Sequence, residues 1–258
     1  ARIMPDDTIL KIDFRCRLGY WHNGVKTKSD PLKEKAMSDV TRRKFLGAAA
    51  GGTALAVLKP SELFAKQKDF EMLPQPSISD KAGSLMAALR SRKSTRSFSN
   101  RPIPRQLLSD LLWAAFGVNR PDIGYRTAPS PMSSQEIEIY AADVNGLHLY
   151  DARLHQLIQL STEDIRSLCG TQGYVANAPL NLIYVANFSK FGDMEDERKR
   201  FYSAADTGFI SQNVYLFCAA FGLGTVVRDW IDRPTLSKKI RLREEQRIIL
   251  AQTVGYPK

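Results

Sequence analysis

Residues 206–230 read DTGFISQNVYLFCAAFGLGTVVRDW, and this stretch decides the fold. From Thr207 onward it carries apolar residues on nearly all sides of a helix. The helical pattern starts near Glu195 and ends near Phe221. A helix that is apolar on all sides is buried on all sides. One small domain has too little interior to enclose such a helix. The stretch therefore predicts a central helix that also faces a partner subunit.

The residues after this helix predict a strand, a short helix and a second strand. Gly222 and Gly224 end the central helix, GTVVRDW has the composition of a strand, a short helix starts at Thr235, and RIILAQTVGYP forms the last strand. The two glycines also let the backbone approach a flat ligand. They are not a dinucleotide-binding fingerprint, because Val227 stands where a third glycine is needed and the order is helix to strand.

The residues before the central helix predict two helices followed by a sheet. LMAALRSR has helical spacing, and Pro104 opens a second helix with a leucine-rich side. EIEIYAADV and LHLYD alternate as strands about the turn pair Asn145-Gly146, and LNLIYVANF has the pattern of a buried strand. We expect a loop over 121–134 and two short helical segments between LHLYD and LNLIYVANF. The pattern is α+β with one sheet and no internal repeat.

An arginine pair, Arg42 and Arg43, stands directly before an uncharged Ala/Gly-rich stretch, residues 47–58. The stretch is 12 residues long, whereas a membrane-spanning helix needs about 20. A basic flank before a short apolar core is typical of an export signal, and TRRKFL resembles the twin-arginine signal class. The alternative is a basic turn before a buried Ala-rich helix, which two central glycines would weaken by about 1 kcal/mol each.

Signals of this class begin within a few residues of the initiator, so Met37 is the expected start. We therefore expect upstream sequence without function over 1–36, a twin-arginine signal peptide over 37–65, a linker over 66–79 and the functional domain over 80–258. Cleavage at the end of the signal would leave 193 residues, the size of one domain. The product would be periplasmic or otherwise exported, or membrane-tethered if the signal is not cleaved.

The chain carries a formal net charge of +10. Residues 1–65 hold 12 Lys/Arg and 7 Asp/Glu, which leaves 25 basic and 20 acidic side chains in the remainder and an excess of +5 in each part. A mild excess spread along the domain favours an anion site over nucleic-acid binding. Cys218 fits a small core residue, and a bridge to Cys169 is left open. Two histidines, His148 and His155, are too few and too isolated for a metal centre.

Residues 91–98 read SRKSTRSF and follow directly on a helix. Arg92, Ser94 and Arg96 alternate, so an extended backbone would aim all three to one side. Two guanidinium groups and a hydroxyl suit a phosphate, and Lys93 would add a charge from the side. On spacing alone, a solvated basic turn is the simpler interpretation.

The loop APSPMSSQ, residues 128–135, offers three serine hydroxyls beside a rigid Pro129, and by itself it is merely a loop. The sequence contains no Walker loop, HExxH or GxSxG. Nucleotide hydrolysis, zinc proteolysis and serine hydrolysis therefore lose their usual supporting motifs.

Five stretches, taken in order, resemble the nitroreductase family of flavin-mononucleotide (FMN) oxidoreductases. They are RKSTRSF, LLWAAFGVNR with RTAPS, APLNLIYV, DTGFISQN with GLGT, and the terminal VGYP. The resemblance covers about residues 85–257, and its second stretch is most similar to the branch that includes thiazole/oxazole-forming dehydrogenases. It implies a nitroreductase-like α+β fold, with a central antiparallel-type mixed sheet flanked by helices in an interleaved homodimer. It also favours phosphate binding by SRKSTRSF over the basic turn.

The resemblance also assigns cofactor contacts. SRKSTRSF would bind the FMN phosphate and ribityl chain, the APS loop would border the isoalloxazine ring, and GLGT would bring backbone N–H groups toward the ring. Lys258, which follows GYP, would take the place of a basic phosphate ligand that the family usually has beyond GYP. PMSSQ departs from the family's small or Gly-rich stretch, which leaves contacts from Ser133 and Gln135 open. The implied residues are Arg92, Lys93, Ser94, Arg96, Pro129, Ser130, Leu223, Gly224, Thr225 and Lys258, with no metal.

The implied function is an exported FMN oxidoreductase that passes two electrons through flavin N5 in a ping-pong cycle. Its partners would be a second subunit, a small-molecule electron donor and acceptor, and the twin-arginine translocase during export. The flavin carries the reaction, so no side chain is assigned as nucleophile or acid. Two roles of Arg228 are left open. It would stabilise the negative charge of a reduced flavin or a substrate, or it would form a salt bridge at the rim. The alternative function is a flavin-binding carrier or maturation partner without turnover, which would keep the phosphate site but close the ring face.

Overall fold

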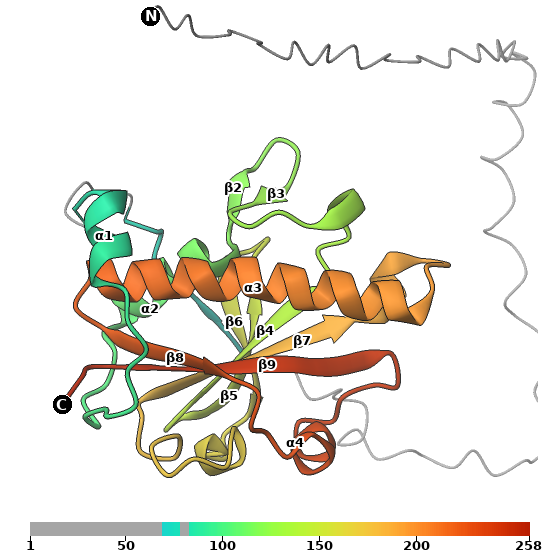
Figure 1. Ribbon diagram of the computed structural model, residues 1–258. Coiled ribbons are helices and arrows are strands. Elements are labelled where there is room, and N and C mark those ends of the chain that lie inside the picture. Colours follow the sequence, from blue (N-terminus) through green and yellow to red (C-terminus); the bar gives the residue numbers. More distant parts are fainter. Residues whose placement is uncertain (1–68, 78–82) are drawn as a thin grey trace, which may run out of the picture. The chain divides into compact units, whose positions relative to one another are not determined.

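The structure, a computed structural model, describes residues 69–77 and 83–258. The expected upstream segment, the twin-arginine signal and parts of the linker lie outside these residues. Figure 1 shows the helices, strands and 3-10 turns (η), which follow in this order: β1 (Phe70–Met72), α1 (Leu85–Ser91), α2 (Arg105–Phe116), β2 (Val118–Arg120), β3 (Tyr125–Arg126), η3 (Pro131–Ser133), β4 (Ile137–Asp143), β5 (Gly146–Asp151), β6 (Gln156–Ser161), η4 (Arg166–Leu168), β7 (Leu180–Asn187), η5 (Phe188–Phe191), α3 (Asp196–Ala220), β8 (Gly224–Arg228), α4 (Arg233–Lys239) and β9 (Gln246–Gly255).

A seven-stranded sheet in the order β1-β6-β5-β4-β7-β9-β8 forms the centre of the fold, and its neighbouring strands all run antiparallel. All eight residues of β7 are buried, because helices or loops cover both of its faces. α2 and α3 cover one face, and α4 packs on the other. The expected α+β fold, a central antiparallel sheet flanked by helices, is confirmed.

The central helix forms at the expected place, as the 25-residue α3. Asp196 and Glu197 in its first turn complement the helix dipole. At its end Gly222 adopts a φ of +71°, and the N–H of Leu223 bonds the Cys218 carbonyl at 2.8 Å. This is a Schellman ending, and it requires the left-handed conformation that glycine adopts without strain.

Within one chain α3 is not buried on every side, and its burial by a partner subunit remains a prediction. Its buried residues recur every three or four positions and include Ile210, Val214 and Cys218, so one face contacts the sheet and α2. On the opposite side Phe201 is 69% exposed and Phe209 is 48% exposed. The helix therefore keeps an apolar face that this chain does not cover.

Two stretches differ from the expected pattern. Residues 156–161 form a strand instead of a helix, since β6 pairs with β5 on one side and with β1 on the other. His155, at a φ of +49°, makes the tight turn that sends the chain back into the sheet. The expected loop over 121–134 contains the short strand β3, paired with β2, and the turn η3. These pairings depend on contacts between segments, which local periodicity does not report.

The two cysteines of the domain are both free and buried. Cys218 belongs to the core between the sheet and α3, whereas Cys169 belongs to the core on the α4 side, so they do not pair. His155 has a structural role, with contacts to Ser109 at 2.8 Å and to Tyr150 at 2.9 Å. Among residues 69–77 and 83–258, no helix has the length and apolar character that a bilayer crossing requires. The same residues contain no group of three metal-ligating side chains.

Candidate functional site

A cationic strip, residues 92–96, runs in extended conformation beside the edge strand β8. Arg92 ends α1 with a ψ of 121°, which turns the chain out of the helix. Ser94 forms a parallel bridge with Thr225, and the N–H of Thr95 donates to the Thr225 carbonyl at 2.9 Å. An extended backbone places alternate side chains on one side, and joint phosphate binding by Arg92, Ser94 and Arg96 remains a prediction.

Tyr215 of α3 connects the strip to the core. The Val227 N–H donates to the Tyr215 hydroxyl oxygen at 3.0 Å, and that hydroxyl lies 2.9 Å from the Ser94 hydroxyl. When Tyr215 donates its own proton to Ser94, the Ser94 proton is left to point outward. The Arg92 guanidinium lies 5.3 Å from the centre of the same tyrosine ring. Tyr215 thus orients two of the predicted phosphate ligands.

The GLGT segment lies against the same strip. A side chain at Gly224 would meet the Thr95 side chain at 2.8 Å, so glycine permits the close approach. The Leu223 side chain is buried in the core. The Thr225 side chain is buried as well, and its hydroxyl donates to the Thr253 carbonyl at 2.7 Å. These two residues therefore have only backbone groups to offer a ligand.

The end of the chain returns to the strip. Phe98 and Pro257 form an antiparallel bridge, and the N–H of Lys258 donates to the Ser97 carbonyl at 3.2 Å. The last residue therefore lies next to the residues that were predicted to bind phosphate. The structure brings together Arg92, Lys93, Ser94, Arg96, Leu223, Gly224, Thr225 and Lys258.

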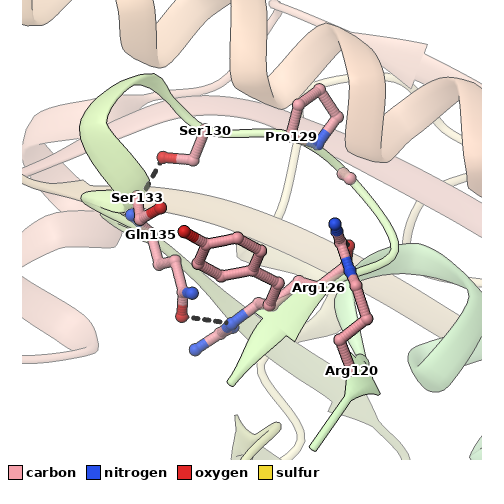
Figure 2. Close-up of a pocket in the computed structure, with 8 residues that line it drawn as sticks. Arg120, Arg126, Pro129, Ser130, Ser133 and Gln135 are labelled. Atoms are coloured by element: carbon pink, nitrogen blue, oxygen red, sulfur yellow. Dashed lines mark hydrogen bonds between the residues drawn. The ribbon is translucent and has the colours of Figure 1, made fainter. Parts of the chain in front are cut away.

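Pro129 and Ser130 lie elsewhere, at a hollow of about 210 Å³ that Figure 2 shows. Arg126 donates to Gln135 at 2.8 Å and stacks on Phe116 at 4.4 Å. Gln135 also donates to the Gly124 carbonyl at 3.0 Å, which ties two sides of the hollow together. The lining residues are Arg120, Tyr125, Arg126, Ala128, Pro129, Ser130, Ser133 and Gln135.

The strip and the hollow contact α3 at different places. Tyr215 touches the strip, and Asp206 lies near Ser130. Nine residues separate these two positions, which corresponds to roughly 13 Å along a helix. Within one chain, the predicted phosphate contacts and the predicted ring contacts at Pro129 and Ser130 are therefore not joined.

Sequence reasoning missed a buried acidic pair behind Ser130. Glu136 is fully buried, and its Oε2 accepts hydrogen bonds from Ser134 at 2.9 Å and Ser130 at 3.2 Å. Asp206 is 2% exposed, and Glu136 is close enough for its charge to act on the Asp206 carboxyl group. Burial, followed by the charge of Glu136, raises the pKa of Asp206 to about 7. An aspartate in an otherwise apolar helical run was the available sign of this pair.

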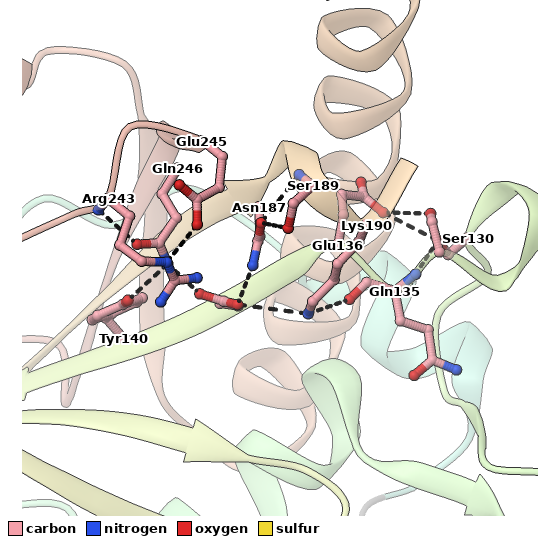
Figure 3. Close-up of polar contacts among 12 residues, drawn as sticks. Ser130, Gln135, Glu136, Tyr140, Asn187, Ser189, Lys190, Arg243, Glu245 and Gln246 are labelled. Atoms are coloured by element: carbon pink, nitrogen blue, oxygen red, sulfur yellow. Dashed lines mark hydrogen bonds and ion pairs between the residues drawn. The ribbon is translucent and has the colours of Figure 1, made fainter. Parts of the chain in front are cut away.

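A second polar network continues along β4 from Glu136, as Figure 3 shows. Glu138 accepts from Gln246 at 2.6 Å and from Asn187 at 3.2 Å, and its carboxylate lies 3.6 Å from the Lys190 amine. Lys190 also donates to the Gln135 carbonyl at 3.1 Å. Burial lowers the pKa of Lys190, and the nearby Glu138 opposes that shift. This network holds the segment that carries Glu136.

The comparisons with known proteins identify the family. A model described as the nitroreductase family matches residues 89–256, more than half of the chain. The chain belongs to the nitroreductase family. A candidate nitroreductase of Methanocaldococcus jannaschii, MJ1384, is 31% identical over 145 residues, which cover 52% of this chain and 73% of that protein.

Two solved structures are similar to this member of the nitroreductase family. A candidate nitroreductase from Ralstonia eutropha is 42% identical with a TM-score of 0.70, covering 73% of this chain and 90% of that one. The Escherichia coli microcin synthetase complex McbBCD has a TM-score of 0.54 at 16% identity, covering 84% of this chain and 79% of that one. At 16% identity, the similarity to McbBCD shows a shared fold and nothing more.

Arg228 does not form the rim salt bridge that the sequence left open, because its side chain lies inside this nitroreductase. The side chain is 6% exposed, and its guanidinium donates to Thr253 at 2.6 Å, to the Cys169 carbonyl at 2.8 Å and to Asn181 at 3.1 Å. Burial lowers its pKa, while the guanidinium remains the centre of a neutral network. Arg228 therefore holds Thr253, Cys169 and Asn181 together in the interior, and it forms no salt bridge within the described residues.

Proposed function

We propose that this protein is an FMN-dependent oxidoreductase that passes two electrons from a small-molecule donor to a small-molecule acceptor in a ping-pong cycle. The bound flavin would accept and donate the electrons at its N5 position. The LLWAAFGVNR and RTAPS stretches support a place near the thiazole/oxazole dehydrogenase branch of the family. The chain's own residues bind the flavin, orient it and keep the acceptor next to it.

The exposed cationic strip carries this proposal. Lys93 and Arg96 are exposed and Arg92 is half-buried, and in the described part of the chain no carboxylate forms an ion pair with any of them. Their charges are thus available to an anionic group. Ser94, oriented by Tyr215, adds a neutral donor. These residues fit the phosphate of FMN, and the backbone of GLGT lies beside them.

We also propose a homodimer in which α3 contributes the interface. The exposed Phe201 and Phe209 on the uncovered face of α3 support this, since an apolar face of this kind favours association. A dimer would also let the hollow of one subunit approach the strip of the other, which a single chain does not do. Light scattering of the flavin-bound protein is expected to give twice the mass of the chain. A stable, flavin-bound monomer would refute this part of the proposal.

Export by the twin-arginine route agrees with the proposed cofactor. FMN held without a covalent bond cannot accompany an unfolded chain, whereas this route is expected to carry folded proteins. Binding of FMN would also stabilise the folded cargo by mass action. Changing Arg42 and Arg43 to Lys is expected to leave a yellow protein in the cytoplasm. Normal export of that double variant would refute the twin-arginine assignment.

The test of the function is stopped-flow mixing of the purified, flavin-loaded protein with NADH, NADPH and quinols. Loss of the yellow colour with one donor, followed by its return with an acceptor, is the expected result. A protein that binds FMN but exchanges electrons with none of these would favour the alternative, a carrier without turnover. A protein that does not bind FMN would overturn the proposal itself.

A further inference from the structure

Of the acidic pair, Glu136 lies directly before β4 and Asp206 lies in the first half of α3. Their side chains are 0% and 2% exposed. Each keeps one buried oxygen, Oε1 of Glu136 and Oδ2 of Asp206, without a hydrogen-bond partner among the described residues. Ser203 and Thr207, on the same buried face of α3, also have unpartnered hydroxyls. The pair therefore lies in a polar pocket of the core whose bonding is incomplete.

Two carboxylates cannot both stay ionised in such a place, because burial and mutual repulsion penalise the second charge. The cations next to this segment bond other groups, although the charges of Lys190 and Glu136 also act on each other. Lys190 contacts Glu138 and the Gln135 carbonyl, and Arg126 donates to the Gln135 side chain. One proton between the two carboxyl groups removes the repulsion and supplies the missing hydrogen bond. The raised pKa of Asp206 agrees with this state.

Ser130 connects the pair with the hollow. Its hydroxyl is 3.2 Å from Oε2 of Glu136 and 2.9 Å from the Ser134 hydroxyl, and it also acts on the pKa of the nearby Asp206. The N–H of Gln135 donates to the same oxygen at 2.9 Å, which holds the hydroxyl in place. Ser130 also lines the hollow (Figure 2). A hydroxyl with an acid on one side and an open hollow on the other can pass a proton between them.

We propose that Glu136 and Asp206 share one proton and deliver it through Ser130 to an electron acceptor bound in the hollow. This rests on the proposed oxidoreductase function. The acceptor class is a carbonyl-bearing molecule such as a quinone, which needs a hydride and one proton for a two-electron reduction. The Ser130 O–H bond breaks as the acceptor O–H bond forms. Ser130 then takes the shared proton, and the pair, now doubly ionised, is reprotonated from water.

The experiment uses the full protein and the variants Asp206→Asn and Glu136→Gln, with Asp110→Asn as the matched control. Asp110 is also buried, at 7% exposure, but its oxygens accept bonds from Ser77 and Gln106, and it takes no part in the proposed route. Infrared spectroscopy of the flavin-free protein is expected to show a protonated carboxyl band at neutral pH. The band is expected to disappear in Asp206→Asn and to persist in the control. In Glu136→Gln it is expected to weaken, because burial still raises the pKa of Asp206 when the charge of Glu136 is gone.

The second measurement separates the two half-reactions by stopped flow, with a quinone as acceptor. General acid catalysis contributes about 10²–10⁴-fold, so we expect acceptor reduction by Asp206→Asn to slow about 100-fold while reduction by the donor is unchanged. The wild-type rate is expected to fall as the pH rises above about 7, and the variant rate is expected to be flat. Glu136→Gln tests the same route if the first variant does not fold.

Three outcomes would overturn the proposal. They are absence of the carboxyl band in the wild type, a band that survives in Asp206→Asn, and equal losses in both half-reactions. If even the wild type shows no turnover, the proposed function fails and the delivery role fails with it. The infrared band, recorded without flavin, still decides whether the pair shares a proton. Failure of the two proposals is therefore distinguishable.

Discussion

At Tyr215, α3 meets a strip of cationic side chains that are open to solvent, whereas at Asp206, nine residues earlier, it meets a buried carboxyl group. Both places include a serine hydroxyl, Ser94 at the strip and Ser130 at the pair. At the strip the charge is free to attract an anion from solution. At the acidic pair the charge is suppressed, and a proton is held instead. The same helix thus supports binding at one position and proton storage at another.

The largest expected effect comes from removing the strip's charges. In Arg92→Ala/Arg96→Ala, each lost charge-assisted contact costs about 1.5–3 kcal/mol, so FMN binding is expected to weaken by roughly 3–6 kcal/mol. Fluorescence titration of FMN into the flavin-free protein measures this change. Arg90→Ala, an exposed arginine in the last turn of α1, is the control and is expected to bind normally. Full FMN occupancy in the double variant would rule out the phosphate assignment.

The next effect concerns the acidic pair and pH. The pKa of Asp206 is about 7 in the folded state against 3.8 as its ordinary value. Between these values the folded state binds more protons than the unfolded state, so the free energy of unfolding falls as the pH rises from about 4 to about 7. Asp206→Asn cannot ionise, so it is expected to be more stable than the wild type, and the difference is expected to grow as the pH rises through this range.

Urea unfolding of the flavin-free proteins at pH 4, 6 and 8 checks this expectation. Asp110→Asn is again the control, since it changes a buried carboxyl outside the pair. Parallel stability curves for the wild type and Asp206→Asn would show that Asp206 ionises in the folded protein as readily as in the unfolded chain. In that case the acidic pair would be charged like the strip, and the contrast between an exposed charge and a suppressed one would not hold.

The smallest expected effect is a change in the free energy of unfolding on replacing Tyr215, and it tests whether the Tyr215 hydroxyl holds the strip. Tyr215→Phe leaves the Val227 N–H without its acceptor and Ser94 without its oriented partner. An unpaired buried donor costs about 1–3 kcal/mol, so the free energy of unfolding is expected to fall by about 1–2 kcal/mol. Tyr202→Phe, on the same helix, is the control, because its hydroxyl contacts only the exposed Arg198 among the described residues. Equal losses in the two variants would mean that the Tyr215 hydroxyl does not hold the strip.

Local features of the sequence predicted much of the fold. α3, α2 and the β4–β5 hairpin occur where the apolar periodicity, Pro104 and Asn145-Gly146 placed them. The strip and the GLGT turn are adjacent, as the family resemblance implied. The strand β6 was not predicted, because its identity depends on pairing with two other strands. A short segment is decided by its neighbours more than by its own composition.

The sequence by itself determined the family, the α+β class and the position of a basic, serine-containing strip after the first helix. Each of these depends on residues close together in the chain or on motifs in a given order. Only the tertiary structure decided that Arg228 is buried under Cys169, Asn181 and Thr253, and that Glu136 meets Asp206. Folding brings these residues together from distant segments, and burial then sets their charge states. The physical reason is that desolvation depends on what surrounds a group in space, which the spacing of residues along a chain does not specify.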